Sequence, residues 1–153
     1  MELNSKDKKN NPILEYAILA GVVIVFLIFI FQIRTGDVNF CRAIFKDLAG
    51  GRYGVQKYID WEHFQGLDID VAATYNSFAT QKEKTGYKKA FIQSFSRGFK
   101  NAGGRYKAFV NWRIYSKAGN QITVAADYQG RNQTLLFTLP SAGKKKLIAL
   151  QWQ

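Results

Sequence analysis

The chain has 153 residues, of which 22 are Lys or Arg and 11 are Asp or Glu, so its net charge at pH 7 is +11. Its one histidine excludes any mechanism that needs two, and its one cysteine excludes an internal disulfide and a zinc site built from thiolates. Motifs of the types GxxxxGK followed by Ser or Thr, GxGxxG, HExxH and CxxC do not occur, so the sequence predicts neither a metal nor a cofactor.

The run from Ala17 to Phe31 contains no charged and no polar side chain. With the apolar residues on either side it reaches roughly 20 residues, the length that crosses a hydrocarbon core of ~30 Å. The sequence therefore predicts a short basic tail over residues 1–11, a transmembrane helix over residues 12–34 and a folded domain over residues 35–153. Ala17 and Gly21 are four residues apart, a spacing that lets another transmembrane helix approach closely.

Two other interpretations of this run stay open. A cleavable signal peptide also begins with a basic stretch, but its apolar core is shorter and is followed by small residues, whereas this run ends in Phe29, Ile30 and Phe31. A type IV pilin begins with a hydrophobic helix that carries an early glutamate, here Glu15, but its processing site needs a glycine where this chain has Asn10. We therefore favour an uncleaved anchor, with a pilin-like subunit as an alternative.

The orientation of the predicted transmembrane helix depends on the basic residues at its two ends. The short tail before the helix carries Lys6, Lys8 and Lys9, and a nearly equal number of basic residues follows the helix. Because the opposite topology would carry three lysines across the membrane, we expect the N-terminus in the cytoplasm. The domain is then periplasmic or extracellular, and its own charge does not oppose this because long domains are translocated whatever their charge.

Nearly all of the net positive charge lies in the predicted domain. Residues 1–33 hold three lysines against three acidic residues, so the whole charge of +11 belongs to the chain from Arg34 onward. Such a field attracts anionic lipid headgroups, an acidic protein or nucleic acid, and it acts over a Debye length of about 8–10 Å. With an anchor so near, we expect membrane lipids and other membrane protein subunits as partners, in preference to nucleic acid.

Helical periodicity appears in three parts of the domain. After a break at residues 35–37, apolar residues recur with helical spacing from Val38 to Leu48, and a second short helix is expected within residues 52–64. Cys41 lies on the apolar face of the first of these helices and is expected to be a small buried hydrophobe, with lipidation or an intermolecular disulfide as alternatives. The third and clearest helix spans about Lys82–Ala102 and ends at two glycines.

The aromatic residues of the third helix lie four apart and are expected to face the core rather than to cradle a cofactor. Between the second and third helices, alternation around residues 67–71 suggests a brief strand. Beyond the third helix the period changes to two, which predicts strands over about 106–114, 122–128, 133–139 and 147–152. Short connections make these strands antiparallel neighbours. The predicted fold class is α+β, with two or three helices packed on a four-stranded antiparallel meander sheet.

This order of elements resembles a known family. Two short helices in the segment FCRAIFKDLAGGRYGVQKYID, a longer helix in TGYKKAFIQSFSRGF and a C-terminal meander are similar to a nuclear transport factor 2-like domain, the cone-shaped α+β fold shared with ketosteroid isomerases. The resemblance covers about residues 37–153. It implies a concave face of the sheet, lined by helices, that either holds a ligand or is filled by aromatic side chains.

Enzymes of that family place an Asp, a Tyr or a His in the cone, and this chain offers a small set of such residues. The set comprises Asp60, His63, Asp127, Tyr58, Asp68 and Asp70. Asp60 and His63 are three residues apart on an expected helix and could touch, although such pairs are more often surface contacts or caps. No catalytic pattern of the family can be transferred residue by residue, so a non-enzymatic role is favoured and the candidates for ligand binding are Asp60, His63 and Asp127.

We therefore expect a membrane-anchored accessory or structural subunit that uses a basic, aromatic-rich domain for contacts with proteins or the membrane surface. The candidate interaction residues are Trp112, Tyr115, Tyr128, Trp152, Lys89, Arg97, Lys100, Lys144, Lys145 and Lys146. The alternative is a tethered cone that binds or transforms a small apolar molecule, which requires an open pocket of at least about 300 Å³. Nucleic-acid binding by the basic stripe of the long helix is a third possibility.

Overall fold

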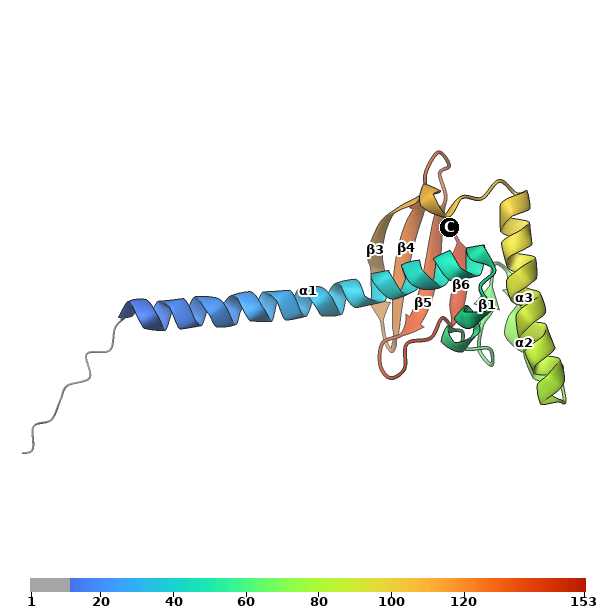
Figure 1. Ribbon diagram of the computed structural model, residues 1–153, viewed down its shortest axis with the longest axis horizontal. Helices are drawn as coiled ribbons and strands as arrows, with labels where there is room; N and C mark the ends of the chain where they lie inside the picture. Colours follow the sequence, from blue (N-terminus) through green and yellow to red (C-terminus); the bar gives the residue numbers. More distant parts are fainter. Residues whose placement is uncertain (1–11) are drawn as a thin grey trace, which may run out of the picture. The chain divides into compact units, whose positions relative to one another are not determined.

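The computed structural model describes the backbone of residues 12–153 and the side chains of residues 19–27 and 36–153. The chain divides between Thr35 and Gly36 into two compact units. Its elements, in chain order, are α1 (Pro12–Gly50), the 3-10 helix η1 (Tyr53–Tyr58), β1 (Gln65–Gly66), β2 (Ile69–Asp70), α2 (Val71–Ser77), α3 (Gln81–Asn101), the 3-10 helix η2 (Tyr106–Ala108), β3 (Phe109–Ala118), β4 (Gln121–Tyr128), β5 (Thr134–Pro140) and β6 (Ala149–Trp152) (Figure 1). The fold class is α+β, as predicted.

In the first unit, the described side chains are those of residues 19–27, and every one of them is exposed. The large apolar ones among them are between 50% and 66% exposed. A Cβ atom at Gly21 would meet no other atom within 4 Å. The basic tail of residues 1–11 and the side chain of Ala17 lie outside the described residues. Over the residues that could be searched, no helix is sufficiently long and apolar for a membrane span.

The helix α1 is continuous from Pro12 to Gly50, so the predicted break at residues 35–37 is wrong. A glycine in a helix costs about 1 kcal/mol relative to alanine, which is why Gly36 suggested an interruption. Asp37 does not cap a new helix; its carboxylate is buried and lies 2.6 Å from Nζ of Lys145. A tertiary contact therefore lies at the point where the sequence predicted a break, and the cost of one helical glycine, about 1 kcal/mol, does not interrupt the helix.

The end of α1 is fixed by Gly51, which follows it, and by Ser96 of α3. Gly51 has φ of 72°, a conformation that favours glycine, and its N–H donates to the carbonyl of Leu48. A Cβ at Gly51 would also lie 3.1 Å from Oγ of Ser96. Ser96 is buried and donates a hydrogen bond of 2.8 Å to the carbonyl of Ala49. The last turn of α1 therefore packs directly on the C-terminal half of α3.

The segment between α1 and α3 is less regular than predicted. The expected second helix is the 3-10 helix η1, and the expected brief strand is replaced by the two short strands β1 and β2. Leu67 and Asp68 form the turn between them, with φ of 48° and 66°. Asp70 then caps α2, which the sequence did not predict, because its carboxylate accepts a hydrogen bond from the N–H of Ala73.

The long helix α3 agrees with the prediction. A capping box begins it, because the Thr80 hydroxyl accepts from the Glu83 N–H while the Glu83 carboxylate accepts from the Thr80 N–H. The hydroxyl of Thr80 also donates to that carboxylate, so these bonds lower the pKa of Glu83. The helix ends before Gly103, with φ of 74°, and Gly104, where a Cβ would collide with Phe99.

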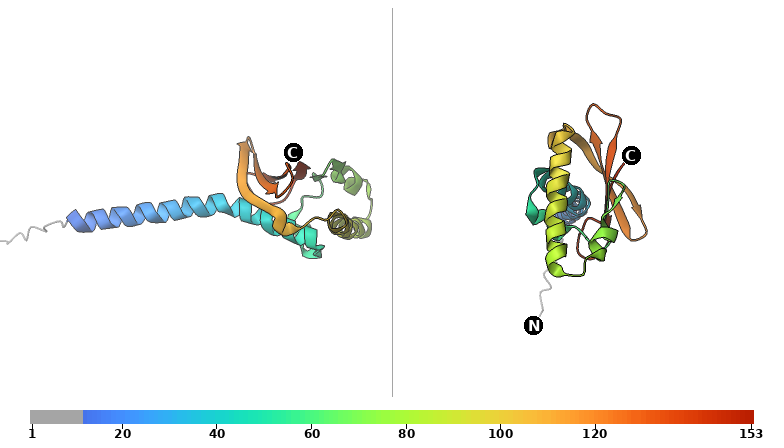
Figure 2. Two further views of the ribbon diagram at one scale, coloured as in Figure 1. Left: turned by 90° about the horizontal axis from the view of Figure 1, so that it is seen from above. Right: turned by 90° about the vertical axis from the view of Figure 1, so that its right-hand side faces the viewer.

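The sheet has six strands in the order β2-β1-β6-β5-β4-β3, so the prediction of a four-stranded antiparallel meander is wrong. Strands β3 to β6 pair antiparallel in sequence, but β1 adds to the edge of β6 in parallel and makes the sheet mixed. The missed strands are two residues each, too short to show a period of two. Figure 2 shows the bent strands, with α3 seen end-on in the left view.

The core of the second unit lies between the last turns of α1, helix α3 and the sheet. Phe45 of α1 is 1% exposed, and its ring lies within 6.4 Å of six other aromatic rings. These rings belong to Phe95, Phe99, Tyr106, Phe109, Trp112 and Phe137. Cys41 is fully buried one turn earlier, and burial raises the pKa of its thiol, which makes it an inert part of the core.

We predict that Phe45→Ala lowers the free energy of unfolding by about 3–5 kcal/mol, because it removes a ring from the centre of this aromatic cluster and leaves a cavity. Urea unfolding of the full chain in mild detergent, followed by near-UV circular dichroism, measures the change. The control is Tyr115→Ala, which removes a ring that is 49% exposed and should cost about 1 kcal/mol or less. Equal losses in the two variants would contradict the central position of Phe45.

Candidate functional site

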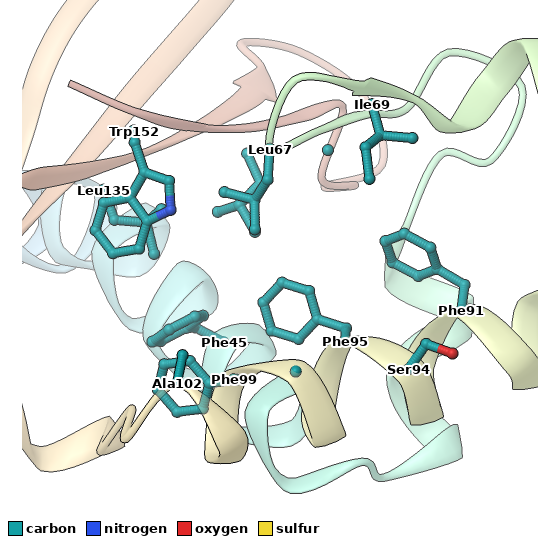
Figure 3. A pocket seen from close by; sticks show the side chains of 13 residues that line it. Phe45, Leu67, Ile69, Phe91, Ser94, Phe95, Phe99, Ala102, Leu135 and Trp152 are labelled. Carbon is teal, nitrogen blue, oxygen red and sulfur yellow. The ribbon is translucent and has the colours of Figure 1, made fainter.

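An apolar cavity of about 420 Å³ lies between α3, the β1–β2 turn and the sheet (Figure 3). It is lined by Phe45, Gly66, Leu67, Ile69, Phe91, Ser94, Phe95, Gly98, Phe99, Ala102, Leu135, Leu150 and Trp152. Figure 3 shows the rings of α3 on one side of the cavity and Leu67 with Trp152 on the other. The volume falls within the range of about 300–1,000 Å³ that is typical of ligand pockets.

Two rows of residues on α3 build one wall. Phe91, Phe95 and Phe99 are four apart and therefore lie one above another on the helix. Ser94 and Gly98, together with Ala102 just after the end of α3, form the adjacent row with the same spacing. Small side chains in this second row leave space beside the aromatic row, so the cavity exists because one edge of the aromatic stripe is not filled.

The opposite wall comes from the β1–β2 hairpin, which the sequence predicted only as one brief strand, and from β6, which it did predict. The β1–β2 turn contributes Leu67 and Ile69, and β6 contributes Trp152. The main chain of Leu67 is held there, because its N–H donates a hydrogen bond of 2.7 Å to the carbonyl of Leu150. Ile69 is 59% exposed and Trp152 is 40% exposed, so apolar surface continues from the cavity to its mouth.

Almost all side chains that line the cavity are apolar. Ser94 supplies a hydroxyl and Trp152 an indole N–H, and no Asp, Glu, His, Lys, Arg, Tyr or Cys is among the lining residues. General acid or base catalysis needs a titratable group within hydrogen-bond reach of the substrate. Nor does the described part of the chain contain three His, Cys, Asp or Glu side chains placed to hold a metal ion. The cavity is therefore suited to bind an apolar group.

The predicted ligand-binding pair Asp60 and His63 lies outside this cavity. Nδ1 of His63 is 3.2 Å from the Asp60 carboxylate, so the two side chains do touch, and the His63 side chain is 72% exposed. Tyr58, Asp68 and Asp70 are also absent from the lining. The structure thus brings together two of the candidate residues, but on the surface.

Asp127 is held in a hydrogen-bond network on the sheet. The register of β3 shifts between Val110 and Arg113, and Asn111 in that bulge has φ of 53°. The Asp127 carboxylate accepts bonds from Arg113 at 2.8 Å, Asn111 at 3.2 Å and Thr134 at 3.1 Å. The bond from Arg113 is the largest cause of a lowered pKa at Asp127. This carboxylate is committed to the bulge and does not face the cavity.

The predicted aromatic interaction residues occupy different environments. Trp112 and Tyr128 pack against the core, Tyr115 is largely exposed, and Trp152 lines the cavity. The basic residues Lys89, Arg97 and Lys100 are exposed on α3. Of the predicted interaction residues, the structure places only Trp152 at the cavity.

The three lysines Lys144, Lys145 and Lys146 line a second hollow, together with Phe40, Lys57 and Tyr58. We call this hollow the basic pocket; its volume is about 430 Å³. Lys57 was not singled out in the sequence because it lies far from the lysine triplet along the chain. The aromatic spacing on α3 indicates a core face, whereas the adjacent row of small residues is the sequence signal of the apolar cavity that the prediction missed.

No protein-family model, curated protein or solved structure matches this chain.

We predict that Asp127→Asn lowers stability at neutral pH, because the ionised carboxylate is favoured by its bonds in the folded state. A pKa lowered by folding contributes stability that is present above the unfolded value of about 3.9 and is lost as the pH falls through the folded value. The difference between wild type and variant should thus shrink below about pH 4. Unfolding free energies measured from pH 2 to 7 test this, with the exposed Asp68→Asn as control; a difference that does not change with pH would contradict it.

Proposed function

We propose that this protein is a non-enzymatic accessory subunit of a membrane assembly, anchored by one transmembrane helix over residues 12–34. The observation that carries the proposal is the apolar cavity, which is open at its mouth and has no titratable side chain in its lining. Such a surface binds an apolar group, and its lining offers no titratable side chain to transfer a proton or to activate the Ser94 hydroxyl. The proposed orientation has the N-terminus in the cytoplasm and the domain in a periplasmic or extracellular space.

The exposed apolar side chains of residues 19–27 support the anchor. Monomeric soluble proteins rarely expose contiguous apolar surface of this kind, and such a patch marks a membrane or protein contact. In the sequence the apolar run continues on both sides of these residues, from Ala17 to Phe31, and with its flanks reaches roughly the 20 residues that span a bilayer. Gly21 exposes its backbone, which allows close approach of a helix from another subunit.

A partner subunit is the proposed occupant of the apolar cavity. Ile69 and Trp152 extend the apolar surface outward from the mouth. At such a surface, a protein partner buries one central side chain in the pocket and makes further apolar contacts around it. Trp and other aromatic residues are enriched at the centre of such interfaces. The inserted group would be an apolar side chain of the partner that packs against Phe95 and Leu67.

The domain is further proposed to be nuclear transport factor 2-like. Its support is the order of elements, with the helices first and the longest strands last, and a cavity enclosed between α3 and the sheet. The resemblance implied a concave face that is either open to a ligand or filled by aromatic rings. Here aromatic rings fill one part, around Phe45, and leave the other part open.

A small apolar ligand is the second candidate occupant, and the cavity volume of about 420 Å³ is the observation in its favour. This alternative predicts that the purified chain, without any other protein bound, retains a small apolar molecule that mass spectrometry detects after denaturation. It also predicts that filling the cavity removes this molecule.

We predict that Gly98→Leu abolishes co-purification of the partner subunit, because the new side chain occupies the cavity mouth. A Cβ at Gly98 meets no atom within 4 Å, so the substitution enters empty space and does not disturb α3. The measurement is the amount of partner chain, per copy of this chain, recovered from membranes that are washed with alkaline carbonate and then solubilised in mild detergent. The wash retains an integral membrane protein in the pellet, so it also tests the anchor.

The matched control is Gly86→Leu, which makes the same change at an open position of α3 that does not line the cavity. Both changes replace glycine in a helix and should stabilise α3 by about 1 kcal/mol, so a difference between them reports on the cavity alone. Three results would contradict the proposal: no co-purifying chain with the wild type, equal recovery with both variants, or release of the chain by the wash.

A further inference from the structure

The basic pocket brings together three segments that lie far apart in the sequence, and main-chain contacts join two of them, the end of η1 and the loop that carries the three consecutive lysines. Leu147 pairs with Ile59 in a parallel bridge, and both side chains are buried in the core. The Leu147 N–H donates to the carbonyl of Tyr58 at 2.7 Å, and the Asp60 N–H donates to the carbonyl of Leu147 at 3.0 Å. The loop of residues 144–146 is thereby held beside η1, so that Lys57 and Lys146 lie on neighbouring segments of the chain.

One lysine of the pocket is neutralised and ties the turn to α1. Lys145 is paired with the buried carboxylate of Asp37. Lys57, Lys144 and Lys146 have no carboxylate within 4 Å among the residues that the structure describes. Three positive charges without a carboxylate partner within 4 Å among the described residues therefore line one hollow, and the fourth lysine is paired with Asp37.

Aromatic rings form the rest of the pocket. Phe40 and Tyr58 make an edge contact with their ring centroids 5.7 Å apart, and Nζ of Lys57 lies 4.8 Å from the Tyr58 centroid. Tyr58 is 38% exposed, so its ring is accessible at the mouth. Tyrosine and lysine side chains together are typical of protein surfaces at the level of lipid headgroups, where an amphipathic ring and a cation can both be satisfied.

The basic pocket lies close to the proposed transmembrane helix. Asp37 comes three residues after Arg34, so the chain permits at most about 11 Å between their Cα atoms, however the two units are arranged. Because Lys145 touches Asp37, the pocket stays close to Arg34, the last residue of the proposed transmembrane helix. We infer that the basic pocket binds the phosphate of an anionic phospholipid headgroup in the membrane that holds the anchor. The inference rests on the anchor of the proposed function.

The test is the affinity of the detergent-solubilised full chain for two lipids with identical acyl chains, phosphatidylglycerol and phosphatidylcholine, measured by native mass spectrometry. Each lysine near a membrane surface contributes about fivefold in affinity for anionic lipid, hence about 100-fold for three. The wild type should therefore prefer phosphatidylglycerol by about that factor, and the triple variant Lys57→Gln, Lys144→Gln, Lys146→Gln should lose the preference. Lys145 is left unchanged so that its pair with Asp37 keeps the turn in place.

The matched control removes an equal number of positive charges, three, from α3 and leaves the pocket unchanged; its substitutions are Lys89→Gln, Arg97→Gln and Lys100→Gln. None of these residues lines the basic pocket, so the preference should fall by less than about fivefold, the share of one lysine. An equal loss in both triple variants would show a diffuse field in place of a site and would overturn the inference. So would a wild type that binds the two lipids equally.

Soluble anions are the competing source of the same phosphate chemistry. Inorganic phosphate, or a single-stranded oligonucleotide at the same phosphate concentration, should not displace phosphatidylglycerol from the wild type. Displacement by either one would assign the pocket to a soluble anion or to nucleic acid and would contradict the lipid assignment. Release of the chain by alkaline carbonate would reject the anchor itself, independently of the lipid affinities.

Discussion

The packing of Phe45 against six aromatic rings is the interaction on which the rest of the domain depends. Its ring lies where the last turns of α1, helix α3 and the sheet meet, and it is a member of both the core and the cavity lining. The close approach of Gly51 to Ser96 fixes the end of α1 on α3. With α3 held in this way, its aromatic row closes the core on one side, while its row of small residues leaves the cavity open on the other.

The regular elements were predictable from the sequence because they are long enough for the period of their apolar side chains to be recognised. Helix α3 combines a capping box, an aromatic stripe and a glycine end, and β3 to β5 have seven to ten residues each. The parallel addition of β1 to β6 was not predictable, since two residues carry no period and the pairing is set by main-chain bonds from Gln65 and Leu67. The contact between Asp37 and Lys145, which lies where a break in α1 was expected, joins residues too far apart in the sequence to be predicted from it.

The candidate site was predictable only in part, for a physical reason. Sequence reasoning favours residues that carry chemistry, and here those residues are engaged elsewhere: Asp127 by the β3 bulge and Asp60 by His63. The cavity is made by what is missing, namely side-chain volume at Ser94, Gly98 and Ala102. The domain thus separates its two surfaces, an apolar cavity without titratable groups and a basic pocket of lysines and aromatic rings, which suits a protein that binds two different kinds of neighbour.

The central claim is that the apolar cavity receives an apolar side chain from a partner subunit of the same membrane assembly. Site-specific photo-crosslinking in the native membrane tests it most directly, with a photoreactive phenylalanine at Ser94, in the cavity mouth, or at Gln93, an exposed neighbour on α3 that does not line the cavity. Consecutive helix positions point about 100° apart, so the two probes sample different surroundings. The account predicts a crosslink to one protein chain from Ser94 and not from Gln93. No protein crosslink from Ser94, or the same crosslinks from both positions, would contradict it.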